Sequence, residues 1–220
     1  NIAKVTGSWD NWSGSLKLNV AKATNVILKS NIEVFPISGS WNNGSGQYMD
    51  KPVNHTGVSW VYSDYSGSNK WSTGGWNPLI TASFSGSNNA GGGVWYTGSG
   101  GYEGIGPLEF TQSFNLRSDK DLNINVTDAL RVWYSSSNGL NAGKIEIANQ
   151  GFIVKWEKDK EFITESAITP QLSYYSVDTN TIYPPQLEIK WDDSVYETGS
   201  LEVINTPDLF VALDNNQGIF

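Results

Sequence analysis

The stretch Ser15-Leu-Lys-Leu-Asn-Val20 alternates apolar and polar side chains, with Leu16, Leu18 and Val20 on one side of the backbone. Because successive side chains of a strand point to opposite faces, this period of two predicts a strand with one buried face. Similar short apolar segments recur along the chain, separated by residues typical of turns. We predict further strands at residues 25–29, 32–37, 58–62, 109–116, 122–126, 144–148, 152–156, 171–177 and 184–191.

One segment has a different period. Thr127-Asp-Ala-Leu-Arg-Val-Trp-Tyr134 begins with a residue type common at helix N-caps, followed by an acid, and it places Leu130 and Trp133 three residues apart. This pattern predicts a helix of about two turns that ends before the run Ser135-Ser-Ser-Asn-Gly139. Many short strands and one short helix predict an all-β protein. We expect a jelly-roll-like antiparallel β-sandwich with long aromatic and Gly-rich loops.

The composition excludes several classes of function. The 220 residues include no Cys, so disulfides, zinc–thiolate sites, iron–sulfur clusters and a Cys nucleophile are absent. The net charge is −8, with only 14 Lys and Arg residues spread along the chain, which argues against nucleic acid as the main partner. No apolar run approaches the ~18–20 residues that a membrane span needs, so we expect no membrane partner.

The sequence indicates two domains of unequal length. We predict a β-sandwich over residues 1–191, with an insertion-like Gly-rich loop at 85–106. Beyond it, residues 192–220 change in composition and contain apolar segments at 201–204 and 209–213, which we interpret as a linker and the first strands of a following β module. The chain starts without Met and ends on an apolar pair after a turn-like segment. We therefore expect it to be a fragment of a longer polypeptide.

The Gly-rich loop carries Trp95, Tyr96 and Tyr102, which a passive linker would not need. Two interpretations are open. The aromatic side chains pin the loop to the sandwich, or they form an exposed platform on which sugar rings stack. Elsewhere we expect one set of side chains to form the core: Leu16, Leu18, Phe35, Trp41, Trp60, Leu130, Trp133, Leu187 and Ile189.

Catalytic residues are not expected. The single histidine, His55, has no nucleophile motif around it. A glycosidase would need a pair of carboxylates about 5–10 Å apart. The carboxylates that we considered are Glu103, Glu109, Asp128, Glu146, Glu188, Asp192 and Asp193. Most of them are explained by solvated strand faces or by a helix start, so we predict that the chain is not an enzyme.

No cofactor is expected, but a structural Ca²⁺ remains open. The densest acidic clusters are Asp119-Lys-Asp121 and Asp192-Asp193. Carboxylate and amide oxygens suit calcium, yet neither cluster has the spacing of a known calcium loop.

The order of several motifs resembles that of the DNRLRE-type β-sandwich, a module of extracellular and cell-wall proteins. The resemblance covers about residues 15–191. The matching segments are Leu16-Lys-Leu-Asn-Val20, Ile32-Glu-Val-Phe-Pro-Ile-Ser-Gly-Ser-Trp41, Gly57-Val-Ser-Trp-Val-Tyr-Ser-Asp-Tyr65, Trp71-Ser-Thr-Gly-Gly-Trp76, Asn125-Val-Thr-Asp-Ala-Leu-Arg-Val-Trp133, Asn138-Gly-Leu140, Phe162-Ile-Thr-Glu-Ser-Ala167 and Pro185-Gln-Leu-Glu-Ile-Lys-Trp191. The chain departs from that family at Asn125, where Asp is usual, in the near absence of the opening strands, and at the 85–106 insertion. The resemblance implies a structural or adhesive module and supplies no catalytic residues.

The segment Leu201-Glu-Val-Ile-Asn-Thr-Pro-Asp-Leu-Phe-Val-Ala-Leu-Asp-Asn-Asn216 and the Cys-free, Asn- and Ser-rich composition resemble large virion proteins of tailed bacteriophages. This resemblance implies a structural component of a tail, baseplate or neck that binds other virion subunits in a homo- or hetero-oligomeric assembly, and possible contact with host-surface glycans. The alternative is a carbohydrate-binding or adhesion module of a secreted or cell-surface protein, with Trp95, Tyr96 and Tyr102 as its contact surface.

Overall fold

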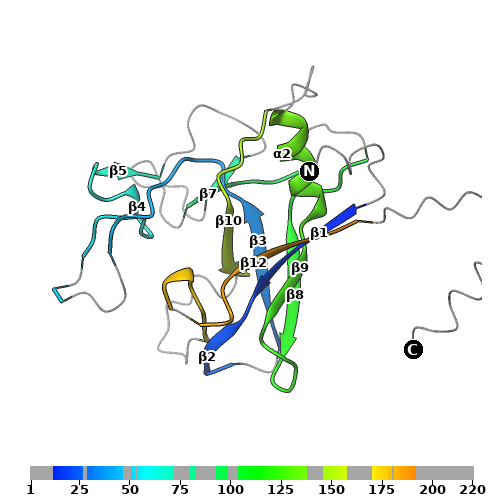
Figure 1. Ribbon diagram of the computed structural model, residues 1–220, viewed down its shortest axis with the longest axis horizontal. Helices are drawn as coiled ribbons and strands as arrows, with labels where there is room; N and C mark the ends of the chain where they lie inside the picture. The colour runs from blue at the N-terminus through cyan, green and yellow to red at the C-terminus, as the bar shows by residue number, and fades with distance from the viewer. Residues whose placement is uncertain are drawn as a thin grey trace, which may run out of the picture.

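The computed structural model describes residues 12–26, 29–46, 51–52, 54–71, 80–82, 93–98, 104–137, 146–157, 170–179 and 181–191 (Figure 1). Strands dominate these ranges, every strand pair is antiparallel, and one α-helix is present among them. The predicted fold class, an all-β antiparallel sandwich with one short helix, is therefore confirmed.

The first sheet has three strands in the order β12-β1-β9. Its members are β1 (Trp12–Leu18), β9 (Leu122–Asn125) and β12 (Gln186–Trp191). The central strand β1 contains the alternating stretch that predicted it, and Leu16 lies opposite Leu187 on one neighbour and Ile124 on the other. The pairing of β1 with β12 joins the two ends of the described chain in one sheet.

The second sheet also has three strands, in the order β10-β3-β8. Its members are β3 (Lys29–Pro36), β8 (Phe110–Asn115) and β10 (Phe152–Trp156). Ile32 and Val34 of the central strand β3 are buried, whereas Asn31 and Glu33, which alternate with them, are only half-buried. This alternation is expected of a strand with one face on the core.

Three two-stranded sheets complete the fold. The strand β2 (Val20–Thr24) pairs with β11 (Gln171–Tyr174), and a 3-10 turn at Val177–Thr179 follows β11. The other two pairs are β4 (Tyr62–Asp64) with β5 (Asn69–Lys70), and β6 (Ile80–Ala82) with β7 (Val94–Tyr96). Figure 1 shows β4 and β5 projecting to one side of the two main sheets.

The hydrophobic core lies between the two main sheets and continues beneath the helix. One buried cluster joins the sheets through Ile32, Val34, Phe114, Leu122, Ile124 and Val126. A second cluster surrounds the helix through Tyr96, Leu108, Ala129, Val132, Trp133 and Ile147. Phe110, Leu130 and Phe152 pack against both clusters, so the two parts form one continuous core.

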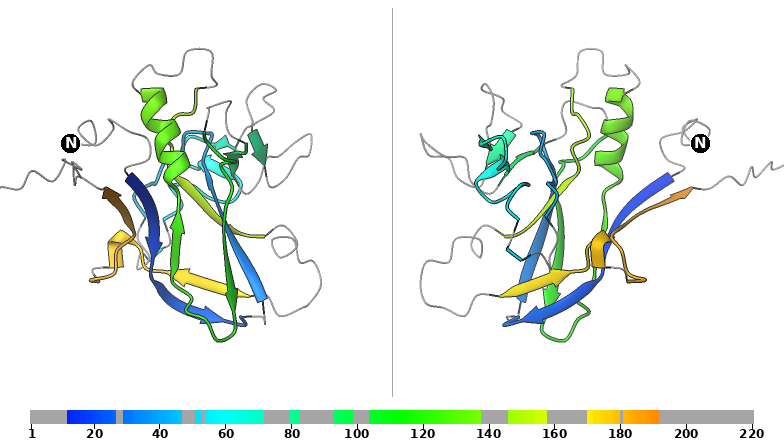
Figure 2. Two further views of the ribbon diagram at one scale, coloured as in Figure 1. Left: turned by 90° about the vertical axis from the view of Figure 1, so that its right-hand side faces the viewer. Right: turned by 60° about the vertical axis from the view of Figure 1, so that its left-hand side comes forward.

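The helix α2 (Thr127–Ser137) follows β9 directly and is longer than predicted. It lies at one end of the main sheets (Figure 2). The serine run that we expected to end it continues it, since Ser135 is only 1% exposed and lies in the helix. Within the described ranges, no helix is long and apolar enough to cross a membrane.

The side chains of Asn125 and Thr127 stabilise the start of α2 through different hydrogen bonds. The Oδ1 atom of Asn125 accepts hydrogen bonds from the backbone N–H of Thr127 at 2.9 Å and from its hydroxyl at 2.6 Å. The hydroxyl oxygen of Thr127 in turn accepts the backbone N–H of Gly14 on β1 at 2.9 Å. Thr127, which we predicted as the N-cap, therefore ties the helix to the sheet, while Asn125 fixes the turn that leads into the helix.

Several local predictions differ from the structure. Residues 146–148 form no strand, and the strand expected at 58–62 begins only at Tyr62. Of the expected core residues, Phe35 and Trp133 are buried, but Trp41, Trp60 and Leu187 are exposed. Leu187 lies on an edge strand, where only one side of the strand has a described neighbour. The predicted segments at 201–204 and 209–213, and the whole 192–220 region, lie outside the described residues.

Gly14 is the point at which α2 approaches β1 most closely. A Cβ atom at this position would overlap the Cδ1 atom of Leu130. Gly14 also accepts the backbone N–H of Val126 at 2.8 Å, which fixes the distance between the two elements. Any side chain at position 14 must therefore displace Leu130, which belongs to both core clusters.

We predict that Gly14→Val lowers the free energy of unfolding by about 1–3 kcal/mol, because overpacking displaces Leu130 in a filled core. Ser13→Val is the matched control, since Ser13 is the neighbouring residue of β1 and points to the opposite face. We expect it to change stability by less than about 0.5 kcal/mol. Urea denaturation of the three proteins measures both values, and equal stabilities would contradict the close contact.

Tyr174 at the end of β11 packs against the core between the sheets. Its hydroxyl oxygen is buried and has no hydrogen-bond partner among the described residues. Burial raises the pKa of Tyr174 to about 12, and the Asp121 carboxylate adds to the rise. A buried hydroxyl without a partner costs about 1–3 kcal/mol of desolvation free energy.

We predict that Tyr174→Phe raises the free energy of unfolding by about 1 kcal/mol at pH 7, since it removes the unpaired hydroxyl. The variant should also lose less stability at alkaline pH. In the wild type, the unfolded tyrosine ionises near its ordinary pKa of 10 and the folded one near 12, so stability falls between these values. Denaturation at pH 7 and pH 11.5, with the exposed Tyr183→Phe as control, measures both effects. A less stable variant at pH 7 would contradict the unpaired hydroxyl.

Candidate functional site

The structure buries two of the three predicted ligand-binding residues. Trp95 and Tyr96 lie on β7 and are 4% and 7% exposed, respectively. The Trp95 ring packs 5.5 Å from the Phe35 ring, and Trp95 forms an isolated β-bridge with Ile37 at the end of β3. These contacts hold Trp95 against β3, and the burial of both residues leaves little of either ring exposed to a ligand. Tyr102 lies outside the described residues.

The carboxylates that we considered for catalysis occupy separate elements. Glu109 precedes β8, Asp128 begins α2, Glu146 precedes β10 and Glu188 lies on β12. Asp128 forms an ion pair with Arg131 at 3.7 Å and accepts the backbone N–H of Gly106 at 3.1 Å. These contacts give the Asp128 carboxylate a local structural role. Glu103, Asp192 and Asp193 lie outside the described residues.

In the calcium candidate Asp119-Lys-Asp121, one carboxylate oxygen of each Asp accepts a backbone hydrogen bond. Asp121 accepts the backbone N–H of Val20 at 2.7 Å through Oδ1, and Asp119 accepts the backbone N–H of Asp121 at 3.3 Å. In the part of the chain that the structure describes, no group of three or more His, Asp or Glu residues could hold a metal ion.

The segment between β3 and Trp71 forms a candidate binding surface that we did not predict from the sequence. This segment folds back on itself through backbone hydrogen bonds from Asn42 to Ser63 at 2.9 Å and from Val58 to Asn42 at 2.7 Å. Gly44 has a positive φ of 75° and packs directly on the backbone of Gly57, so neither position leaves room for a side chain. Trp71 closes the segment, since it is 6% exposed and its indole N–H donates to the Ser59 carbonyl at 2.9 Å.

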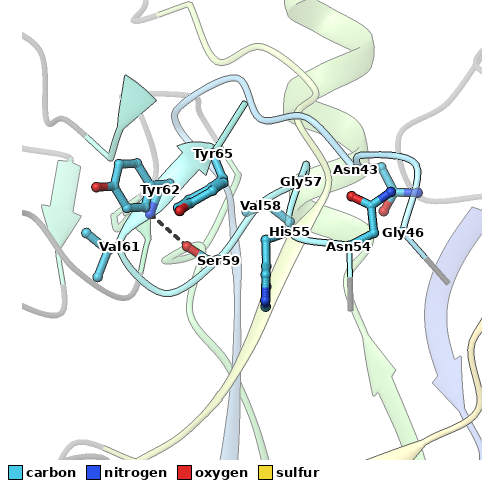
Figure 3. A pocket seen from close by; sticks show the side chains of 10 residues that line it. All are labelled: Asn43, Gly46, Asn54, His55, Gly57, Val58, Ser59, Val61, Tyr62 and Tyr65. Atoms are coloured by element: carbon cyan, nitrogen blue, oxygen red, sulfur yellow. Dashed lines mark hydrogen bonds between the residues drawn. The ribbon is translucent and has the colours of Figure 1, made fainter. Parts of the chain in front are cut away.

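One side of this segment forms a polar cleft of about 730 Å³. Figure 3 shows its lining, with the rings of Tyr62 and Tyr65 at one end, the Asn43 and Asn54 amides at the other, and His55 between them. The Tyr62 and Tyr65 rings meet edge to face at 5.1 Å, and His55 lies 6.3 Å from Tyr65. Amide, imidazole and phenol groups line the cleft, so it offers both donors and acceptors.

The same segment also lines an aromatic groove of about 340 Å³. Its exposed walls are Trp41 and Trp60, which are 40% and 52% exposed. The indole N–H of Trp41 donates to the Gln150 carbonyl at 2.7 Å, which fixes the orientation of that ring. The described residues that line the groove are Ile37, Trp41, Val58, Ser59, Trp60, Trp71, Gly93, Phe152, Ile153, Val154 and Lys155.

The polar cleft and the aromatic groove adjoin each other. Val58 and Ser59 line both, so the two hollows share one short stretch of chain. Lys155 brings a cation to the groove, but its Nζ atom is already paired with Glu33 at 2.8 Å. The combined surface therefore offers two exposed indole faces beside uncharged hydrogen-bonding groups. This combination suits a polyhydroxylated ligand with apolar ring faces better than a charged one.

Sequence reasoning missed Trp41 and Trp60 as surface residues because it assigned both to the core. Large aromatic side chains are buried more often than not, and that rule led to the error. A signal was available in the flanking residues. Trp41 stands among Gly, Ser and Asn without the alternation that a core strand would show, whereas Trp60 lies in a segment that looks like a strand.

The fold and the surface together define the chain as an all-β sandwich module with an exposed aromatic groove. No known protein family matches the chain, and no curated protein or solved structure matches it either. The resemblance to the DNRLRE-type sandwich and the domain boundary at 191 thus stay predictions.

Proposed function

We propose that the chain is a non-enzymatic structural component of a bacteriophage virion, of the tail, baseplate or neck type, that acts through contacts with neighbouring subunits. The observation that supports this proposal is the apolar edge of the first sheet. On β12, Leu187 and Trp191 are 47% and 54% exposed, at an edge that has no second strand among the described residues. Exposed apolar side chains on an open sheet edge favour association with another chain.

The environment of the polar side chains is consistent with a structural role. His55 is exposed in a loop and its nearest aromatic neighbour is Tyr65. Asp64 accepts a hydrogen bond from the Ser66 hydroxyl at 2.8 Å, and this bond lowers the pKa of Asp64. Its carboxyl is therefore ionised at neutral pH and poorly suited to donate a proton in catalysis.

The proposal predicts that β12 is covered in the assembled particle. Lys190 on β12 is 71% exposed in the isolated chain, so amine-acylating reagents should modify it readily. In purified particles we expect at least about five-fold less modification of Lys190, because a neighbouring subunit excludes the reagent. Lys51 is the control, since it is exposed and belongs to no strand. Mass spectrometry measures both sites. A chain that is absent from purified particles would contradict the virion role.

A second candidate function is a carbohydrate-binding or adhesion module of a secreted or cell-surface protein, and the aromatic groove favours it. Trp41 and Trp60 present indole faces on which sugar rings stack, and the adjoining polar cleft supplies Asn43 and Asn54 for hydroxyl groups. On a virion the same groove would bind glycans of a host surface. The ligand surface of this candidate is thus the groove rather than the buried pair Trp95 and Tyr96.

This second candidate predicts glycan binding that depends on Trp60. We expect Trp60→Ala to weaken binding on a glycan array by about ten-fold or more, since exposed tryptophans often dominate binding energy. Leu116→Ala is the matched control, because Leu116 is 58% exposed and does not line the groove. A chain that binds no glycan, or equal binding by both variants, would contradict this function.

A further inference from the structure

Among the described residues, β12 is an edge strand. In the order β12-β1-β9 it pairs with β1 on one side, and no other described strand pairs with its second side. Figure 2 shows β12 at the margin of the first sheet, next to β1. The backbone groups on the outer side of an edge strand form a ready template for another strand.

The two faces of β12 differ in chemistry. Leu187, Ile189 and Trp191 share one face, and they lie opposite Leu16, Gly14 and Trp12 of β1. Since Trp12 is buried and Gly14 contacts the helix, this is the face that turns toward the core. The apolar side chains of β12 thus extend the core-facing side of the sheet out to its edge.

The opposite face of β12 carries charges of both signs. Glu188 forms ion pairs with Lys17 at 2.9 Å and with Lys190 at 3.2 Å. Lys190 is the more exposed of the two lysines, at 71% against 31%. Its ammonium group is therefore able to reach beyond the sheet edge.

We propose that β12 is a self-association site, at which the partner is a second copy of this chain. The two β12 strands pair antiparallel about a two-fold axis at Ile189. Ile189 then faces Ile189, Leu187 faces Trp191 twice, and Glu188 faces Lys190 twice. The sheets of both copies join as β9-β1-β12-β12-β1-β9. This inference rests on the proposed assembly function and names the partner at that edge.

Charge complementarity selects this register over its neighbours. A shift of the partner by two residues in one direction places Glu188 opposite Glu188, and a shift in the other direction places Lys190 opposite Lys190. Like charges directly opposite each other destabilise a strand pair, whereas opposite charges and large apolar pairs stabilise it. A shift by one residue would turn the apolar face of one copy to the charged face of the other. The register centred on Ile189 avoids all of these conflicts.

Two charge reversals test the pairing. Lys190→Glu places Glu opposite Glu188 at both contacts, and Glu188→Lys places Lys opposite Lys190. We expect the wild type to show a monomer–dimer equilibrium in sedimentation velocity, and each variant alone to have a dissociation constant at least about ten-fold higher. In an equal mixture of the two variants, every charged pair is again of opposite sign. The mixture should therefore regain the dimer as a heterodimer.

A cysteine variant tests the two-fold axis independently, because the chain has no Cys of its own. Ile189→Cys should form a disulfide between copies under mild oxidation, since residue 189 faces itself across the axis. Lys190→Cys is the control and should cross-link far less, because its partner is Glu188. Equal cross-linking of both variants would overturn the proposed register. This test stays decisive even if Glu188→Lys, which also loses the ion pair to Lys17, fails to fold.

The outcomes separate this inference from the proposed function. A wild-type chain that stays monomeric up to ~1 mM would overturn the β12 pairing, and it would leave the virion role standing if the chain is found in particles. A mixture of the charge variants that does not regain the dimer would also overturn it. A chain that dimerises through β12 but is absent from particles would support the pairing and contradict the virion role.

Discussion

The rest of the structure depends on the contact between α2 and β1 at Gly14. The glycine lets Leu130 pack against the backbone of β1, while its N–H and carbonyl bind Thr127 and Val126. This contact fixes the helix against the first sheet. Because Leu130 also packs on the cluster between the sheets, the contact couples the helix to the whole core. In a chain without disulfides, such a filled junction has to supply the rigidity that cross-links provide in disulfide-bonded domains.

The rigid core explains why the surface can expose so many aromatic side chains. Trp71 and Trp95 are buried and anchor the two aromatic segments to β3 and its neighbours. With the anchors in place, Trp41 and Trp60 are left exposed on the same segment and line the groove. The strand β12, which is an edge strand among the described residues, lies in the other main sheet. The two surfaces that we propose for binding therefore belong to different sheets, the groove to the sheet that contains β10 and the strand edge to the sheet that contains β1.

The sequence allowed the fold class and most strands to be predicted, because alternation reports directly on half-buried strands. The strand at 152–156 was predicted with its observed bounds, and β1 was recognised from Leu16 and Leu18. Features set by tertiary contacts could not be predicted. Serine is typical of a turn, but Ser135 is buried and continues α2. Trp41 and Trp60 look like core residues, but their segment folds with both side chains exposed. The groove was missed for the same reason, since it exists only after residues 37, 60 and 153 come together.

The most direct test of this account is hydrogen exchange at the junction of α2 and β1. The amide of Gly14 donates to the Thr127 hydroxyl, and the amide of Val126 donates to the Gly14 carbonyl. If the junction holds the core together, both amides exchange only through global unfolding and are as protected as that of Val34 in the central strand β3. Exchange at Gly14 and Val126 that is faster than at Val34 by about a hundred-fold or more would show that α2 detaches while the sheets stay folded. That result would contradict the central role of the contact.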